Sequence, residues 1–407
     1  MQLELYSQYL LWFFLISFVF GALANYSSFC TMGAVSDWVN FGDQNRMRSW
    51  VTAIVAAGLA CGVLEYLGLI DLDLTTSNET STPPYRNSEL VWLRHVVGGF
   101  MFGIGMTLAS GCGNKTLIRL GEGNLKSIVV LLSIAGSASL MIFTSFDYTL
   151  FLQWMIPLSI SLEDYGIEAQ DVASIGAGLA GIDREPSLGL FVVLAICGLQ
   201  LVWVFKSSEF RGQTQLIVTG ILLGLLVTLG WYLTASAEGI RLIEELNFMD
   251  EPPFASGAQS LTFIGPLAHI VQYVYQGFSD AFLSLGVVAI AGVVVGSFIY
   301  TLVFKKIRIE WFRDISDFVR HLTGGVLMGI GGVLAMGCTI GQGITGFATM
   351  SLGSILAVGS IVIGCMLTMK YQYYRIVYEN ESRLDALLTS LVEVRLLPSV
   401  CRRLDAV

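Results

Sequence analysis

The chain has 407 residues, of which 54% are hydrophobic and only 13% are charged, and its formal net charge is -9. A soluble protein of this length needs more charge to cover its surface, so the composition indicates a protein of the lipid bilayer. The acidic balance argues against nucleic acid as a partner. The seven cysteines form no CxxC motif and only three histidines are present, so we expect neither a metal site nor a cofactor.

Nine apolar runs are each close to the roughly 20 residues that a helix needs to cross a bilayer. They lie at about 6–25, 49–70, 92–111, 126–145, 187–205, 214–233, 281–304, 320–337 and 352–370. The charged residues are concentrated between these runs. The sequence therefore predicts an all-α polytopic membrane protein with about nine transmembrane helices.

The basic residues divide unevenly between the loops. If the N-terminus lies outside, 18 of the 22 Lys and Arg fall in cytoplasmic segments, and the other four are Arg86, Arg94, Arg184 and Arg241. Membrane proteins concentrate Lys and Arg in their cytoplasmic loops. We therefore expect a multi-pass protein of the bacterial inner (plasma) membrane, with a periplasmic N-terminus and a cytoplasmic C-terminus.

The chain contains an internal repeat. Residues 94–112 read RHVVGGFMFGIGMTLASGC and residues 320–338 read RHLTGGVLMGIGGVLAMGC, with 11 of 19 positions identical and no gap. A constant offset of this kind indicates a duplication. Each copy contains a span, a short non-spanning segment, two spans, a second short segment and a final span. The short segments lie at 26–40, 112–124, about 256–275 and 338–350.

The single span at 187–205 separates the two copies, so the second copy should insert upside down. We expect four regions: a first inverted half at 1–145, an acidic outer loop with the linking span at 146–213, a second inverted half at 214–370 and a cytoplasmic tail at 371–407. Inverted repeats place their binding site near the membrane midplane and build it from broken helices at the repeat interface.

The two equivalent Gly-Cys segments are the candidate site. Glycine costs about 1 kcal/mol in a helix interior, so each segment predicts a re-entrant break that starts a short helix. The free N–H groups of such a helix would face the bilayer centre and attract an anion. The candidate substrate-binding residues are Gly111, Cys112, Gly113, Asn114 and Lys115 in the first segment, and Gly337, Cys338, Thr339, Gly341 and Gln342 in the second.

Other interpretations of these residues, and of the tail, stay open. The repeat glycines such as Gly98 and Gly324 are also typical of close packing between helices. Lys115 and Arg119 are either ordinary charges at the cytoplasmic edge or part of an inner funnel for anions. The tail after 371 has apolar residues at helical spacing and would either dock a partner or lie on the membrane surface.

Three segments resemble the YeeE/YedE family of sulfur-compound transporters. Phe29-Cys30-Thr31-Met32-Gly33-Ala34 is similar to the family's first short segment, and the two Gly-Cys segments are similar to its Gly-Cys hairpins. The resemblance covers nearly the whole chain except 146–186 and the tail. It implies an hourglass-shaped protein, with four short re-entrant helices in two inverted repeats, that takes up thiosulfate or a related small sulfur-containing anion and is not an enzyme.

The resemblance also implies that the thiols of Cys30, Cys112 and Cys338 pass the anion along at a central constriction. A cytoplasmic sulfur-carrier or sulfurtransferase protein is the implied partner. Two features depart from the family pattern. The fourth short segment, around Ser260–Pro266, has no cysteine, and Lys115 places a cation where other members are neutral. The alternatives are a transporter of a selenium or other sulfur species, a membrane sulfurtransferase or redox protein that forms a cysteine persulfide, and a non-transporting membrane subunit.

Overall fold

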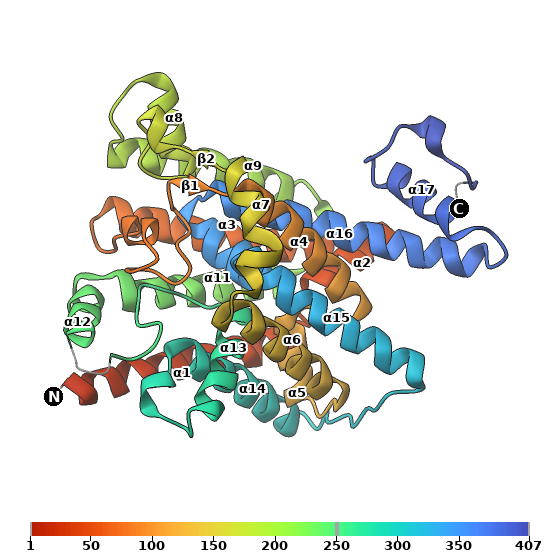
Figure 1. Ribbon diagram of the computed structural model, residues 1–407, viewed down its shortest axis with the longest axis horizontal. Coiled ribbons are helices and arrows are strands. Elements are labelled where there is room, and N and C mark those ends of the chain that lie inside the picture. Colours follow the sequence, from red (N-terminus) through yellow and green to blue (C-terminus); the bar gives the residue numbers. More distant parts are fainter. Residues whose placement is uncertain (1, 249–251, 406–407) are drawn as a thin grey trace.

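The fold is an elongated bundle of helices (Figure 1). The computed structural model describes residues 2–248 and 252–405, and for residues 2–4 it describes the backbone alone. The start of α1 (Gln2–Tyr26) and helix α17 (Arg383–Glu393) lie at opposite ends of the long axis. We call the end that holds the start of α1 and helix α12 (Ala237–Asn247) the α12 face. The opposite end is the α17 face.

Among the described residues, nine long helices form the body of the bundle. They are α1, α3 (Asn45–Tyr66), α4 (Trp92–Leu108), α6 (Lys126–Phe143), α9 (Pro186–Phe205), α11 (Thr214–Ala235), α14 (Leu285–Val303), α15 (Ile315–Leu334) and α16 (Leu352–Val377). In the part of the chain that the structure describes, eight helical stretches are long and apolar enough to cross a membrane. This confirms the prediction of an all-α polytopic membrane protein.

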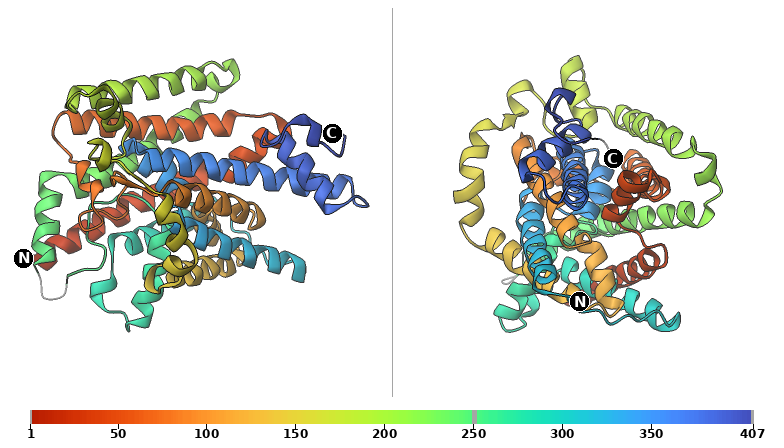
Figure 2. Two further views of the ribbon diagram at one scale, coloured as in Figure 1. Left: turned by 45° about the horizontal axis from the view of Figure 1, so that its top comes forward. Right: turned by 90° about the vertical axis from the view of Figure 1, so that its right-hand side faces the viewer.

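Helix α15 is the long helix that falls outside this set of eight. Its 20 residues are enough to cross a bilayer, but Asp317, Arg320 and His321 in its first turns lower its mean hydropathy. It packs between α4 and α6, so protein covers much of its surface. Helix α9, in contrast, lies on the outside of the bundle (Figure 2, right) and exposes Phe191, Leu199 and Val202.

Four short helical segments follow long helices or loops inside the bundle. They are α2 (Thr31–Phe41), α5 (Gly113–Gly121), α13 (Ile264–Tyr275) and residues 339–349. The last of these is not a regular α-helix, because its middle is the π-helical turn Gly341–Gly346 followed by the 3-10 turn Phe347–Thr349. Turns of this kind are frequent at functional sites.

The loops on the α12 face hold most of the remaining structure. Residues 146–184 contain the short helices α7 (Gln153–Met155) and α8 (Val172–Ala180). Strands β1 (Glu89–Leu90) and β2 (Ile160–Ser161) pair antiparallel there, which is the one sheet among the described residues.

Helix α10 (Ser208–Arg211) connects α9 to α11.

The two copies of the repeat pack against each other through glycine. A Cβ atom added at Gly98 would lie 2.8 Å from the carbonyl oxygen of Gly331, and one added at Gly105 would lie 2.6 Å from that of Gly324. Gly98 and Gly324 are equivalent in the repeat, as are Gly105 and Gly331. Equivalent positions thus exchange partners across the α4–α15 contact, which is the pattern of two antiparallel copies around a local two-fold axis.

The other long helices cross between the copies in the same way. Helix α1 packs on α14 and its counterpart α11 packs on α3, so the first long helix of each half lies against the second long helix of the other. Glycine again permits the approach: a Cβ atom at Gly292 would lie 2.6 Å from the Phe14 carbonyl oxygen, and one at Gly224 would lie 2.4 Å from that of Ala53. The two halves are therefore interlocked rather than separate bodies.

We predict that Gly331→Ala destabilises the protein although it adds one methyl group. The new Cβ would lie 2.6 Å from backbone atoms of Gly98 and Phe102, which cannot move aside without separating α4 from α15. Overpacking of this kind costs about 1–3 kcal/mol. The measurement is the thermal unfolding midpoint of purified protein in detergent.

The matched control is Gly198→Ala in α9, where the added Cβ meets nothing within 4 Å. Alanine favours a helix over glycine by about 1 kcal/mol, so this variant should unfold at or above the wild-type temperature. Equal midpoints for the two variants would contradict the packing argument.

Candidate functional site

Three cysteines occupy the same local turn at three places in the chain. The residue two places before each cysteine has a left-handed backbone, with φ of 52° at Ser28, 57° at Ser110 and 61° at Met336. The residue just before each cysteine donates its N–H to a carbonyl five residues earlier: Phe29 to Ala24 at 2.9 Å, Gly111 to Met106 at 2.9 Å and Gly337 to Gly332 at 2.7 Å. Such bonds satisfy the last carbonyls of a helix that ends inside the protein. Each of the three long helices, α1, α4 and α15, thus ends by presenting a cysteine.

Each of these cysteines then starts a short helix. Cys30 caps α2, and its sulfur accepts the N–H of Gly33 at 3.5 Å. Cys338 precedes residues 339–349, and its sulfur accepts the N–H of Gly341 at 3.4 Å. Cys112 caps α5 with an extended backbone. All three are buried, with at most 7% of the side chain exposed, so each thiol sits at a helix N-terminus that carries partial positive charge.

The thiols meet across the interface between the halves. The side chains of Cys30 and Cys112 lie close enough to interact electrostatically, and Cys112 also lies near the hydroxyl of Thr339. Cys338 directly precedes Thr339 in the chain. The structure therefore brings the three predicted cysteines into one neighbourhood, and we call the group of Cys338, Thr339, Cys112 and Cys30 the thiol line.

The fourth short segment closes the site without a thiol. Phe263 precedes α13, and its backbone lies against the sulfur of Cys338. A Cβ atom at Gly341 would lie 2.5 Å from the Thr262 hydroxyl oxygen, and one at Gly113 would lie 3.3 Å from the terminal methyl group of Ile264. The start of α13 thus supplies one hydroxyl and apolar surface, and the two glycines leave room for this approach.

Buried polar side chains beside the thiols have no hydrogen-bond partner among the described residues. They are the hydroxyl of Thr31, both ends of the Asn114 amide and, apart from its approach to Cys112, the hydroxyl of Thr339. Each lies in the first turn of a short helix. A buried polar atom without a partner costs about 1–3 kcal/mol, so these atoms are suited to bind a polar guest.

The remaining predicted site residues lie in or beside the turns around Cys112 and Cys338. Lys115 has 12% of its side chain exposed and lies 3.3 Å from the Glu122 carboxylate. Gly111 lies against the side chains of Lys115 and Arg119. Gln342 donates to the carbonyl of Ala335 at 2.6 Å and accepts from Ser354, and Gly337 packs against it. The Gln342 amide therefore shapes its own turn, and its contact with a substrate stays a prediction.

Two residues that sequence reasoning missed hold the second turn from the α12 face. The Tyr85 hydroxyl donates to the Gly341 carbonyl at 2.9 Å, and the Nε of Arg86 donates to the Thr349 carbonyl at 3.0 Å. Both lie in a loop without regular structure, and nothing in their local sequence indicates the contact. The N–H of Gly341 donates to the Cys338 sulfur, and the carbonyl of the same residue accepts from Tyr85. Tyr85 therefore helps to fix the residue that binds the Cys338 sulfur.

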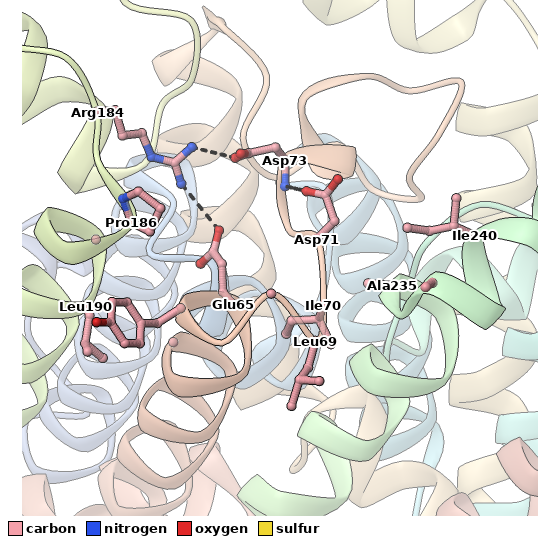
Figure 3. A pocket seen from close by; sticks show the side chains of 15 residues that line it. Glu65, Leu69, Ile70, Asp71, Asp73, Arg184, Pro186, Leu190, Ala235 and Ile240 are labelled. Atoms are coloured by element: carbon pink, nitrogen blue, oxygen red, sulfur yellow. Dashed lines mark hydrogen bonds and ion pairs between the residues drawn. The ribbon is translucent and has the colours of Figure 1, made fainter.

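An ion-pair cluster anchors this loop. Arg184 lies 2.6 Å from Asp73 and 3.4 Å from Glu65 beside a pocket of about 360 Å³ (Figure 3), and Arg86 pairs with the same two carboxylates. Burial raises the pKa of Asp73, but Arg86 and Arg184 outweigh burial and hold the pKa below its usual value. The cluster therefore stabilises the loop fully at pH values above the usual pKa of a carboxyl group. This contribution is lost as the pH falls through the lowered pKa of Asp73.

A cavity lies on each side of the thiol line. On the α12 face, a cavity of about 420 Å³ is lined by Thr262, Met336 and Gly337, which flank Cys338. Toward the α17 face, a cavity of about 550 Å³ is lined by Ser28 and Lys115, which flank Cys30 and Cys112. Chain neighbours of all three cysteines thus line one or the other of these two cavities.

The other cysteines pack elsewhere. Cys61 lies 3.7 Å from the Thr228 hydroxyl, Cys365 lies 3.3 Å from the Thr107 hydroxyl, and Cys197 packs beside Gly58. Within residues 2–248 and 252–405, no group of three or more His, Cys, Asp or Glu side chains is arranged to hold a metal ion.

A polytopic helical bundle with short broken helices and buried polar groups at the interface of two repeated halves is typical of a membrane transporter. The chain belongs to the sulphur transport family, whose model matches residues 26–367, and this confirms the resemblance to the YeeE/YedE family. It is similar to the thiosulfate transporter TsuA of Escherichia coli K12, with 23% identity over 357 residues that cover 83% of this chain and 87% of the relative. It is also similar to the thiosulfate transporter TsuA of Spirochaeta thermophila, with 24% identity over 360 residues that cover 86% and 95%.

We predict that mild oxidation links Cys30 to Cys112 by a disulfide. The two thiols lie close enough to interact, although they are 82 positions apart in the chain. The measurement is peptide mapping by mass spectrometry after treatment with copper phenanthroline. Cys30→Ser should abolish this linkage, whereas Cys365→Ser should leave it. A Cys30 peptide linked mainly to Cys365 or Cys61 would contradict the geometry.

Proposed function

We propose that this protein takes up thiosulfate, or a related small sulfur-containing anion, through the thiol line. The observation that carries the proposal is the meeting of Cys338, Thr339, Cys112 and Cys30 at the interface between the two halves. Family membership supports a sulfur compound as the cargo, and the names of the two relatives support thiosulfate.

The chemistry of the site fits an anion that is soft at one end and polar at the other. Thiols are polarisable and weakly donating, so each can contact a sulfur atom without holding it tightly. The oxygen atoms of the anion would meet the N–H groups of the short helices and the unpartnered groups of Thr31, Asn114 and Thr339. Glycine at 111, 113, 337 and 341 keeps the backbone close to the path, and Lys115 supplies a cation beside it.

The anion would enter from the α12 face and leave at the α17 face. The α17 face holds the loops that carry most of the Lys and Arg, whereas the acidic loops lie on the α12 face. By the positive-inside rule we infer that the α17 face is cytoplasmic and that the start of α1 lies in the periplasm, as expected for a protein of the bacterial inner membrane. In this orientation 1–145 and 214–370 are the two inverted halves, joined by 146–213 and followed by the cytoplasmic tail 371–407, whose last two residues lie outside the described part.

Uptake of a dianion into an inside-negative cell costs roughly 2.3 kcal/mol per charge for every 100 mV. Rapid consumption of the anion by a cytoplasmic sulfur-carrier or sulfurtransferase protein would offset this cost. Helix α17 leaves Leu384 and Leu387 exposed while Ala386 and Val392 are buried. We infer that this exposed face is where such a partner docks.

The three cysteines should matter for uptake and the others should not. We predict that Cys112→Ala or Cys338→Ala lowers the initial rate of labelled thiosulfate uptake by at least about ten-fold, because a hydrogen bond to a charged guest contributes about 1.5–3 kcal/mol. Cys197→Ala should transport like the wild type, since Cys197 packs away from the thiol line. The measurement is uptake into cells or proteoliposomes at matched protein amounts. Equal loss in all three variants would exclude the thiol relay.

Topology gives a separate test. We predict that a reporter fused to the C-terminus behaves as cytoplasmic, and that a cysteine placed at Asn78 reacts with a membrane-impermeant reagent from the periplasm. Asn78 lines the cavity on the α12 face. Periplasmic activity of the C-terminal reporter would reverse the proposed direction and leave the fold unchanged.

A further inference from the structure

The cavity toward the α17 face is strongly basic. Five basic side chains line its volume of about 550 Å³, namely Lys115, Arg119, Lys305, Lys306 and Arg308, against the two acidic side chains Glu122 and Glu310. Among the described residues, Lys115 alone of the five has a carboxylate partner, which is Glu122. Glu310 is bound instead by the side-chain amide of Asn124 at 2.8 Å. The cavity therefore holds an excess of positive charge that the described residues do not neutralise.

Both halves of the protein build this cavity, and their backbones are joined at its rim. The N–H of Arg308 donates to the Glu122 carbonyl at 3.0 Å, and the N–H of Leu125 donates to the Glu310 carbonyl at 3.1 Å. These bonds hold the loop after α14, which carries three of the five cations that line the cavity, against the turn between α5 and α6. The cations are thus positioned by the backbone, although their own side chains are exposed.

The cavity is lined by chain neighbours of two cysteines of the thiol line. Lys115 and Arg119 are four residues apart on α5, so they share one face of the helix that Cys112 begins. The Arg119 guanidinium donates to the Ser110 carbonyl at 2.6 Å and lies against Gly111. Ser28, two residues before Cys30, lines the same cavity. An anion that leaves the Cys30–Cys112 pair would therefore meet Lys115 first, then Arg119 and the loop cations.

We propose that this cavity is a second anion-binding site, distinct from the thiols, that takes a small divalent oxyanion through Arg119, Lys305, Lys306 and Arg308. Because no cysteine lines the site and its cations outnumber its carboxylates, it does not require a sulfur atom in the ligand. It would accept the transported anion as it leaves, and equally sulfate that approaches from the α17 face. The claim that the transported anion passes through this site rests on the proposed function. The claim that a divalent anion binds there does not.

Binding can be measured without transport. The probes are labelled thiosulfate and labelled sulfate, added to full-length Cys112→Ala/Cys338→Ala protein in detergent at constant ionic strength. We expect this thiol-deficient protein to bind both anions, and Lys305→Gln/Arg308→Gln in the same background to weaken both by about five-fold or more, since each lost charge-assisted contact contributes roughly 1 kcal/mol or more. The matched control is Lys206→Gln/Arg211→Gln, which removes two exposed cations from the α9–α11 connection on the same face.

The outcomes separate the two claims. Unchanged binding in Lys305→Gln/Arg308→Gln, or equal weakening in the control, would overturn the site. Arg119→Lys supplies a further check, because it keeps the charge but loses the paired donors of the guanidinium and should also weaken binding. In thiol-intact proteoliposomes, sulfate supplied at the α17 face should inhibit thiosulfate uptake less in the Lys305→Gln/Arg308→Gln variant. Absence of any thiosulfate uptake by the wild type would refute the proposed function, while anion binding dependent on Arg308 would still establish the site.

Discussion

The close approach of α4 to α15 determines the geometry of the whole site. Gly98 and Gly105 on one helix meet Gly331 and Gly324 on the other at distances that leave no room for a side chain. The two helices run antiparallel, so their ends point to opposite faces and present Cys112 and Cys338 from opposite directions. Any residue larger than glycine at this contact would move the two cysteines apart. The thiol line therefore depends on backbone packing several turns away from it.

A second constraint acts at the breaks in the helices. Backbone groups inside a membrane must find partners in the protein, because lipid offers none. The left-handed residue and the five-residue hydrogen bond at each cysteine turn satisfy the end of one helix, and the sulfur of Cys30 or Cys338 accepts an N–H at the start of the next. The thiols are thus part of the structural solution as well as of the proposed path. The fourth segment differs, because the start of α13 has no side-chain cap and Ser260 before it donates its hydroxyl to the Val227 carbonyl within α11.

Much of this arrangement could be predicted from the sequence, for identifiable reasons. Apolar runs specify long helices, and the gapless repeat of 94–112 in 320–338 specifies a duplicated element with a Gly-Cys break in each copy. Contacts between residues that are distant in the sequence could not be predicted, because no sequence pattern marks them. The meeting of Cys30 with Cys112, the bond from Tyr85 to Gly341 and the basic cavity built by residues 305–308 beside α5 depend on how the halves cross. The charged first turns of α15 also show the limit of hydropathy, because a helix that protein covers can carry Asp317 and Arg320.

The interlocking of the halves restricts how the protein can move. Helix α1 lies on α14 and α11 lies on α3, so neither half has an outer surface along which it could rotate as a unit. Rocking one half against the other would have to open the glycine-lined contacts of α4 with α15, α1 with α14 and α3 with α11 at once. Motions that admit and release an anion are therefore confined to side chains and to the short segments at the constriction. A protein built in this way would work more like a narrow, selective channel with small local gates than like a transporter that alternates between two conformations by large domain movements.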